Sequence, residues 1–116
     1  MAAFTVAAGT DWIDTVVFGS ASDRWRLDDY NIWMHVKKAG DATVLLDLST
    51  ENGRLVIRDA AARRIEINVG WPDIENVEPG PFEFDFLLEN KATEIRSRSG
   101  PHTLVITNGI TFQGAP

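Results

Sequence analysis

The chain has 116 residues, of which 44% are hydrophobic and 24% charged, the composition of an ordinary single globular domain. Its formal net charge of −6 argues against nucleic acid as a partner, because phosphate binding needs clustered Lys and Arg side chains. The lack of cysteine excludes disulfides and thiolate metal sites. No apolar run approaches the ~20 residues of a membrane span, and no signal peptide is recognisable, so we expect folding in the cytoplasm of the producing cell.

The first two predicted strands lie near the N-terminus. Phe4–Ala8 is a short apolar run that predicts an edge strand, and Trp12–Phe18 is apolar and β-branched, which predicts a second strand. Both faces of the second strand carry apolar residues. We expect Ile13 and Val17 to be the buried ones.

The third predicted strand is Tyr30–Lys38, in which aliphatic and polar or aromatic residues alternate. Before it, Leu27 is expected to close the end of the sheet while Asp28 and Asp29 turn the chain. The alternation predicts that one face of the strand is buried. Its inward residues are expected to be Ile32, Met34 and Val36.

The stretch from Val44 to Val69 predicts three strands. Two apolar runs, Val44–Leu48 and Leu55–Ile57, flank a polar loop that ends in Asn52-Gly53. Asn-Gly is a strong hairpin signal because both residues tolerate a positive φ, so we expect these two runs to pair. A third run, Ile65–Val69, alternates with polar residues and predicts a half-buried strand.

Gly70–Pro81 contains three prolines and two glycines, which excludes a central strand, although Asp73–Val77 has room for one helical turn. Phe82–Leu88 follows and alternates, with Glu83 and Asp85 at outward positions between apolar residues. This strand is expected at the heart of the core. Its inward residues are expected to be Phe82, Phe84, Phe86 and Leu88.

Two further strands are predicted near the C-terminus. Thr93–Arg98 is expected to point Ile95 inward, Ser99-Gly100-Pro101 is expected to turn the chain, and Leu104–Thr107 is the last strand. Seven to eight strands at intervals of about ten residues favour an antiparallel β-sandwich over a closed barrel or an α/β fold. We therefore expect one all-β domain over residues 1–116.

No motif for catalysis, cofactor binding or metal binding is present. His35, on a strand, and His102, in a predicted turn, are too few and too poorly spaced for a histidine metal site. The acidic residues lie in or near turns without a calcium-loop spacing or a facing carboxylate pair. We expect no catalytic residue, no cofactor, no metal and no small-molecule substrate, and hence a protein that is not an enzyme.

The chain has four tryptophans, which need an explanation in any account of the sequence. They either close the ends of the sandwich or mark a binding surface. Trp33 is predicted on the face opposite the buried aliphatic residues, and Trp71 lies in the Pro/Gly-rich loop. Exposed aromatic residues serve protein interfaces or sugar stacking. We take Trp33 and Trp71 as candidate protein-contact residues, because no polar rim for a sugar can be placed from the sequence.

Four segments resemble a pattern of phage and prophage structural proteins: LLDLSTENGRLVI, RRIEINV, VEPGPFEFDFLLE and LVITNGIT. In that pattern a hydrophobic-Asp strand meets an Asn-Gly turn, a Pro-Gly step opens an aromatic-Asp-aromatic strand, and a Gly-[Val/Ile]-Thr ending closes the domain. The set is similar to the immunoglobulin-like N-terminal domain of phage baseplate upper proteins and related tail and tail-fibre modules. It covers roughly Tyr30–Thr111.

The resemblance implies an immunoglobulin-like fold and a non-enzymatic structural role in a virion, in the tail, baseplate or head–tail region. Its partners would be other virion proteins and copies of itself in a symmetric assembly, with no membrane contact. The terminal segments 1–10 and 108–116 are candidates for flexible arms that become ordered on assembly. The alternative is a carbohydrate-binding β-sandwich used for adhesion to a host surface.

Overall fold

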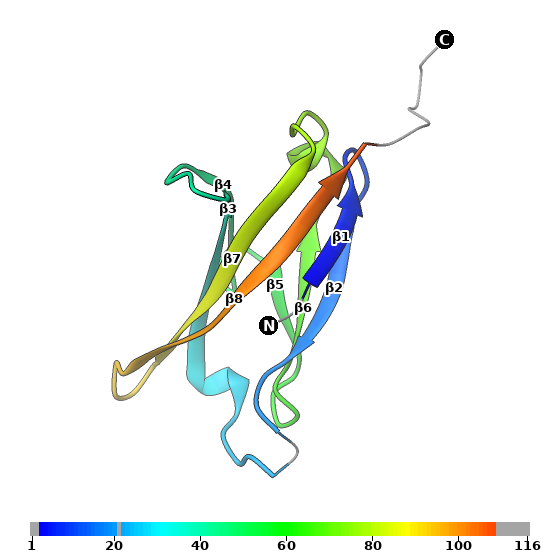
Figure 1. The fold of residues 1–116 in the computed structure, drawn as a ribbon. Helices are drawn as coiled ribbons and strands as arrows, with labels where there is room; N and C mark the ends of the chain where they lie inside the picture. The colour runs from blue at the N-terminus through cyan, green and yellow to red at the C-terminus, as the bar shows by residue number, and fades with distance from the viewer. Residues whose placement is uncertain (1–2, 21, 109–116) are drawn as a thin grey trace.

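The computed structural model describes residues 3–20 and 22–108. Eight strands in this part of the chain form two sheets that pack face to face around one apolar core (Figure 1). The order of the five-stranded sheet is β1-β8-β7-β3-β4, and that of the three-stranded sheet is β2-β6-β5. The strands are β1 (Ala3–Ala7), β2 (Trp12–Val17), β3 (Tyr30–Lys38), β4 (Val44–Ser49), β5 (Leu55–Asp59), β6 (Arg64–Val69), β7 (Gly80–Asn90) and β8 (Arg96–Thr107).

This architecture is the all-β sandwich expected from the sequence, and its strand order can be compared with that of immunoglobulin domains. Strands β8-β7-β3-β4 correspond to G, F, C and C′ of immunoglobulin domains, and β2-β6-β5 correspond to B, E and D. In antibody domains a disulfide joins strands B and F. Here aromatic contacts join the corresponding strands: the ring centroids of Trp12 and Phe84 lie 5.8 Å apart, and those of Phe18, just beyond β2, and Phe86 lie 5.0 Å apart.

The first strand departs from the antiparallel arrangement, because β1 pairs with β8 in parallel, with Phe4 opposite Leu104. The turn after β1 then carries the chain into the other sheet, and its first residue, Ala8, still donates a 2.8 Å hydrogen bond to the carbonyl of Thr107. Strand β1 thus occupies much of segment 1–10. Nearly all of the second candidate arm, residues 109–116, lies outside the described residues.

The predicted hairpin across Asn52-Gly53 is wrong, because β4 and β5 lie in different sheets. The loop does turn at Gly53, with φ +79°, but it crosses the sandwich. Asn52 stabilises the crossing: its Oδ1 accepts a 3.0 Å hydrogen bond from the backbone N–H of Ser49, and its Nδ2 donates to the carbonyl of Asp47 at 2.9 Å. Local turn chemistry therefore predicted the turn correctly but not which strands pair across it.

The predicted facing of β2 is also wrong. Ile13 and Val17 are 56% and 55% exposed, whereas Trp12 and Phe18 are buried. The aromatic side chains present more apolar area than the aliphatic ones, so burying them yields more stabilisation at about 25 cal/mol per Å². Asp14 shares the inner face with them and is accommodated there by a 2.8 Å hydrogen bond that Trp12 Nε1 donates to its Oδ2.

The alternation predicted for the other core strands is confirmed. The inward residues of β3, β6 and β7 are all buried, and Phe86 on β7 is fully enclosed. Leu27 is also buried, in the short 3-10 turn η1 (Leu27–Asp29). A second 3-10 turn, η2, covers Trp71–Ile74 rather than the predicted Asp73–Val77. Neither of these helical turns in the described residues has the length or apolarity to span a membrane.

The β7–β8 hairpin differs from the prediction at two points. Ile95 is 69% exposed because it lies in the connecting turn, where Asn90 N donates to the Ile95 carbonyl at 2.9 Å. The segment Ser99–Pro101 does not end the strand but lies within β8, at a shift in register opposite Phe84–Phe86. Here β8 accommodates an extra residue as a β-bulge instead of turning back.

His102 lies inside β8 and not in a turn as predicted. It is buried against the rings of Phe84 and Phe86, with centroid separations of 5.2 and 5.6 Å. Burial disfavours the charged imidazolium and lowers the pKa of His102 below the ordinary histidine value. The residue is therefore part of the aromatic core.

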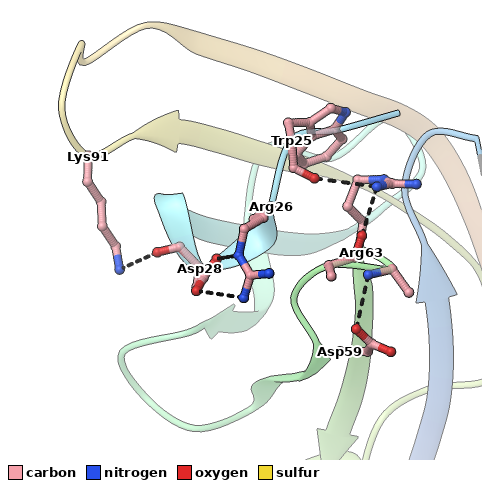
Figure 2. Close-up of polar contacts among 8 residues, drawn as sticks. Trp25, Arg26, Asp28, Asp59, Arg63 and Lys91 are labelled. Carbon is pink, nitrogen blue, oxygen red and sulfur yellow. Dashed lines mark hydrogen bonds and ion pairs between the residues drawn. The ribbon is translucent and has the colours of Figure 1, made fainter. Parts of the chain in front are cut away.

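Arg63, the one buried cation among the described residues, closes the end of the sandwich near the β5–β6 turn. Its guanidinium donates hydrogen bonds to main-chain carbonyls and lies over the ring of Trp25, 5.6 Å from the centroid (Figure 2). Its backbone has a φ of 57°, which is unusual for a residue with a side chain. The carbonyls that accept these bonds belong to Phe18, Ser20, Asp23, Trp25 and Ala61.

Candidate functional site

The outer face of the five-stranded sheet carries the densest collection of aromatic and charged side chains. Because the aliphatic residues of β3 face inward, Trp33, His35 and Lys37 face outward. The same alternation on β7 turns Glu83, Asp85 and Leu87 to that face. The register places these residues directly opposite one another in three rows: Trp33 with Leu87, His35 with Asp85, and Lys37 with Glu83.

These rows line a groove of about 420 Å³. Trp33 and Leu87, both half-buried, provide its apolar surface. Arg98 and Pro101 from β8 border it on the side away from β4. The groove therefore has an aromatic and aliphatic floor with charged side chains around it, which is the usual composition of a binding site.

A row of acidic and basic side chains crosses the sheet at this groove. His35 Nε2 lies 3.2 Å from Asp47 Oδ1 on β4, and Arg98 Nη1 on β8 lies 3.1 Å from Asp85 Oδ2 on β7. Since His35 is also the cross-strand partner of Asp85, the order across the sheet is Asp47, His35, Asp85, Arg98. All four side chains are substantially exposed, so the row stabilises the fold little and leaves charged groups of both signs at the surface.

Gly100 allows β8 to approach this row. A Cβ at this position would lie 2.9 Å from the Cβ of Asp85, and the glycine has a φ of +141°. Only a residue without a side chain fits both the contact and the backbone conformation. Gly100 therefore helps to set the position of β8 beside Asp85.

Two charged side chains of the groove are available to a ligand. Within the described residues, Lys37 and Glu83 have no hydrogen bond or ion pair from their side chains. They lie opposite each other on β3 and β7. One donor and one acceptor are thus free beside the apolar surface of Trp33.

Of the two predicted contact residues, Trp33 lies in this groove and Trp71 does not. Trp71 is 45% exposed in η2, where its backbone N–H donates a 2.8 Å hydrogen bond to Asp11 Oδ1. The remaining tryptophans are structural: Trp12 is buried, and Trp25 packs against Tyr30 with a centroid separation of 5.4 Å. The structure therefore separates the two candidates.

The groove has the chemistry of a binding surface. Of its two carboxylates, Asp85 is engaged by Arg98 and Glu83 has no ion pair with any described residue. In the part of the chain that the structure describes, no group of three His, Cys, Asp or Glu side chains is placed to hold a metal ion. A second hollow, of about 570 Å³, lies near the Arg63 end of the sandwich beside Arg24, Arg26 and Arg64. Arg26 there is paired with Asp28 at 3.1 Å (Figure 2).

Sequence analysis did not identify Asp47, Asp85 and Arg98 as neighbours of Trp33. They come from three strands, and their juxtaposition depends on strand order, which alternation alone does not determine. The only available signal was that Asp85 and Trp33 both sit at outward positions of strongly alternating strands.

In comparisons with known proteins, the chain matches no family model and has no significant match among curated proteins.

Proposed function

We propose that this chain is a non-enzymatic structural module of a phage or phage-like particle, acting through protein–protein contacts in a symmetric assembly in the tail, baseplate or head–tail region. The observation that carries the contact role is the groove on the outer sheet face, in which Trp33 and Leu87 are surrounded by charges of both signs. Protein interfaces combine such an apolar, aromatic centre with a polar rim.

The resemblance to phage structural modules supplies the virion part of this proposal. The segments that carry it include β4 through β7 and the end of β8, so they make up most of one sandwich instead of a scattered set of loops. Asp85 and Arg98 pair with each other, whereas, among the residues described, Lys37 and Glu83 leave one charge of each sign free, which suits a surface that a protein partner with complementary charges covers.

The proposal is tested by measuring the mass of the purified chain by light scattering, first alone and then with the products of the adjacent genes. The expected result is a small species alone and a large, stoichiometric complex with at least one neighbour. A chain that stays small with every neighbour contradicts the assembly role.

A second candidate function is carbohydrate binding, and one specific observation favours it. Polar side chains of the kind that a sugar platform needs, those of Lys37, Glu83 and Asp85, line the same groove as the indole of Trp33. An aromatic face stacks on a sugar ring while such groups bond its hydroxyls.

Titration with a polysaccharide panel, monitored by tryptophan fluorescence and calorimetry, tests this alternative. Binding that is lost in Trp33→Ala and kept in Trp71→Ala supports it. The absence of heat and of any fluorescence change across the panel contradicts it.

A further inference from the structure

The outer edge of β2 differs from the open edges of β4 and β5. Edge strands usually carry charges or bulges that prevent pairing with another chain. Strands β4 and β5 each have a register shift against their neighbour, whereas β2 pairs with β6 over six residues without one. The outward side chains of β2 are Ile13, Thr15 and Val17, none of which is charged.

The first strand does not cover this edge. In immunoglobulin sandwiches of the constant type, strand A lies in the same sheet as strand B. Here the corresponding strand, β1, pairs with β8 in the other sheet, so β2 has a neighbour only on its β6 side among the described residues. Ile13 and Val17 are each more than half exposed as a result.

The hydrogen-bond pattern shows which residues present their backbone groups at the open edge. Phe18 N donates to the Arg63 carbonyl at 3.0 Å, which continues the β2–β6 register one pair beyond Val17–Arg64. Because bonded and non-bonded pairs alternate in an antiparallel ladder, the N–H and C=O groups of Ile13, Thr15 and Val17 point away from β6. Ile13 and Val17 lie at equal distances along the strand on either side of Thr15.

We propose that β2 pairs with β2 of a second copy of this chain, antiparallel and with Thr15 opposite Thr15 on the two-fold axis. In this register Ile13 of each copy lies opposite Val17 of the other. The outward N–H and C=O groups of Ile13, Thr15 and Val17 then form hydrogen-bonded pairs between the two copies. The two three-stranded sheets become one sheet of six strands. The contact is isologous, as a two-fold dimer requires.

The side chains around this register are compatible with self-pairing. No charged residues lie directly opposite each other on the outer face, and Glu66, the β6 neighbour of Thr15, is compensated by Arg58 at 2.8 Å. On the inner face Asp14 lies opposite Val16 of the other copy and remains bonded to Trp12. Ile13 and Val17 supply cross-strand apolar pairs at both ends of the interface.

The second copy is the occupant we favour because, in this register, the outward backbone groups of β2 pair with those of the same segment and its uncharged outward side chains bring no like charges together. The inference does not rest on the proposed virion role, since it concerns the purified chain alone. An adjacent gene product that occupied the edge instead would leave the purified chain monomeric.

The test uses sedimentation velocity over a range of protein concentrations with Thr15→Lys and Thr15→Glu. Each variant places two like charges face to face on the two-fold axis, so each is expected to raise the dimer dissociation constant by about tenfold or more. An equimolar mixture places opposite charges there and is expected to restore dimers. Thr5→Lys, on the exposed edge strand β1, is the matched control and is expected to remain dimeric.

Restored association in the mixture also shows that both variants fold, which circular dichroism checks independently. A wild-type chain that is monomeric at all concentrations overturns the proposal. So does a dimer that persists in both Thr15 variants, or a mixture that stays monomeric while each variant is folded. The sedimentation of the chain alone and its assembly with neighbours are separate readouts, so each proposal can fail without the other.

Discussion

Arg63 Nε donates a 2.9 Å hydrogen bond to the main-chain carbonyl of Phe18, so a side chain from the β5–β6 turn holds the loop that follows β2. The same guanidinium reaches the carbonyls of Asp23 and Trp25 farther along that loop. It is a buried charge whose donors are satisfied by the backbone instead of by a carboxylate. Such a group is costly to remove because the buried Phe18 carbonyl and several part-buried carbonyls then lose their partner.

Arg63→Ala is expected to reduce the free energy of unfolding by about 2–4 kcal/mol. Alanine, like arginine, has a Cβ, so the strain of the positive φ is the same in wild type and variant. The loss of stability therefore measures the contribution of the guanidinium contacts. The adjacent Arg64 is exposed on β6, and Arg64→Ala is the matched control, with an expected change within about 0.5 kcal/mol. Urea unfolding measures both, and equal losses would contradict the role assigned to Arg63.

Phe86→Ala is expected to cost about 3–5 kcal/mol, because the ring is fully enclosed and contacts Phe18 and Phe84. Ile95→Ala provides the comparison at the hairpin tip, where the side chain is exposed and the expected loss is within about 0.5 kcal/mol. Thermal and urea unfolding measure the difference. A large loss at Ile95 would mean that the predicted inward facing of that residue was right after all.

The sequence predicts the strands of this fold better than their arrangement. Alternation correctly predicted the buried faces of β3, β6 and β7, because each has a polar face that solvent must solvate. It failed on β2, where both faces are apolar and the larger aromatic side chains, not Ile13 and Val17, were buried. The Asn52-Gly53 turn formed, but pairing across it depends on which sheet each strand joins, and turn chemistry carries no information on that.

The candidate site was predicted only in part. The outward position of Trp33 follows from the alternation of β3, and the structure places it in the groove. Its neighbours Asp85 and Arg98 come from strands more than 50 residues later in the chain, so only the topology brings them together. Trp71 is exposed as expected but lies outside this groove, because η2 belongs to the connection between the sheets.

Gly100→Ala is expected to destabilise the fold by more than Gly40→Ala. Both glycines have a positive φ, which costs alanine about 1–2 kcal/mol, but only at Gly100 would the new Cβ meet another atom, Asp85 Cβ at 2.9 Å. Gly40 has no atom within 4 Å of that position. The difference between the two variants in urea unfolding measures the cost of the contact between the new Cβ and Asp85. Equal losses of stability would show that β8 can move away from Asp85 without a cost in free energy.

Stability is expected to fall from pH 7.5 toward pH 5, because of His102. Burial lowers its folded-state pKa, so the unfolded chain binds a proton first as the pH drops through about 6.5. The stabilising effect of the neutral imidazole is thus full above that pH and is lost below it. His102→Gln is expected to flatten this part of the profile, measured by urea unfolding at several pH values.

The carboxylates titrate in a separate, lower window. Hydrogen bonds from Arg26 and Arg58 lower the pKa values of Asp28 and Glu66. The contribution of these two carboxylates to folding stability is therefore fully present above their unfolded-state pKa values of 3.8 and 4.5. It is lost only as the pH falls below those values. Between pH 7.5 and 5 the carboxylates therefore contribute little to the pH dependence. If the free energy of unfolding fell equally with pH in wild type and in His102→Gln over this range, the role of His102 would be contradicted.

The most direct test of the central proposal measures binding of the chain to the neighbouring gene product that the light-scattering experiment identifies, using wild type, Trp33→Ala and Trp71→Ala. We predict that Trp33→Ala weakens binding by about tenfold or more while its unfolding curve stays close to wild type, because Trp33 is an aromatic anchor at the groove. Trp71→Ala is predicted to bind as wild type. Unchanged binding by Trp33→Ala would contradict the account, since the groove would then lie outside the contact surface.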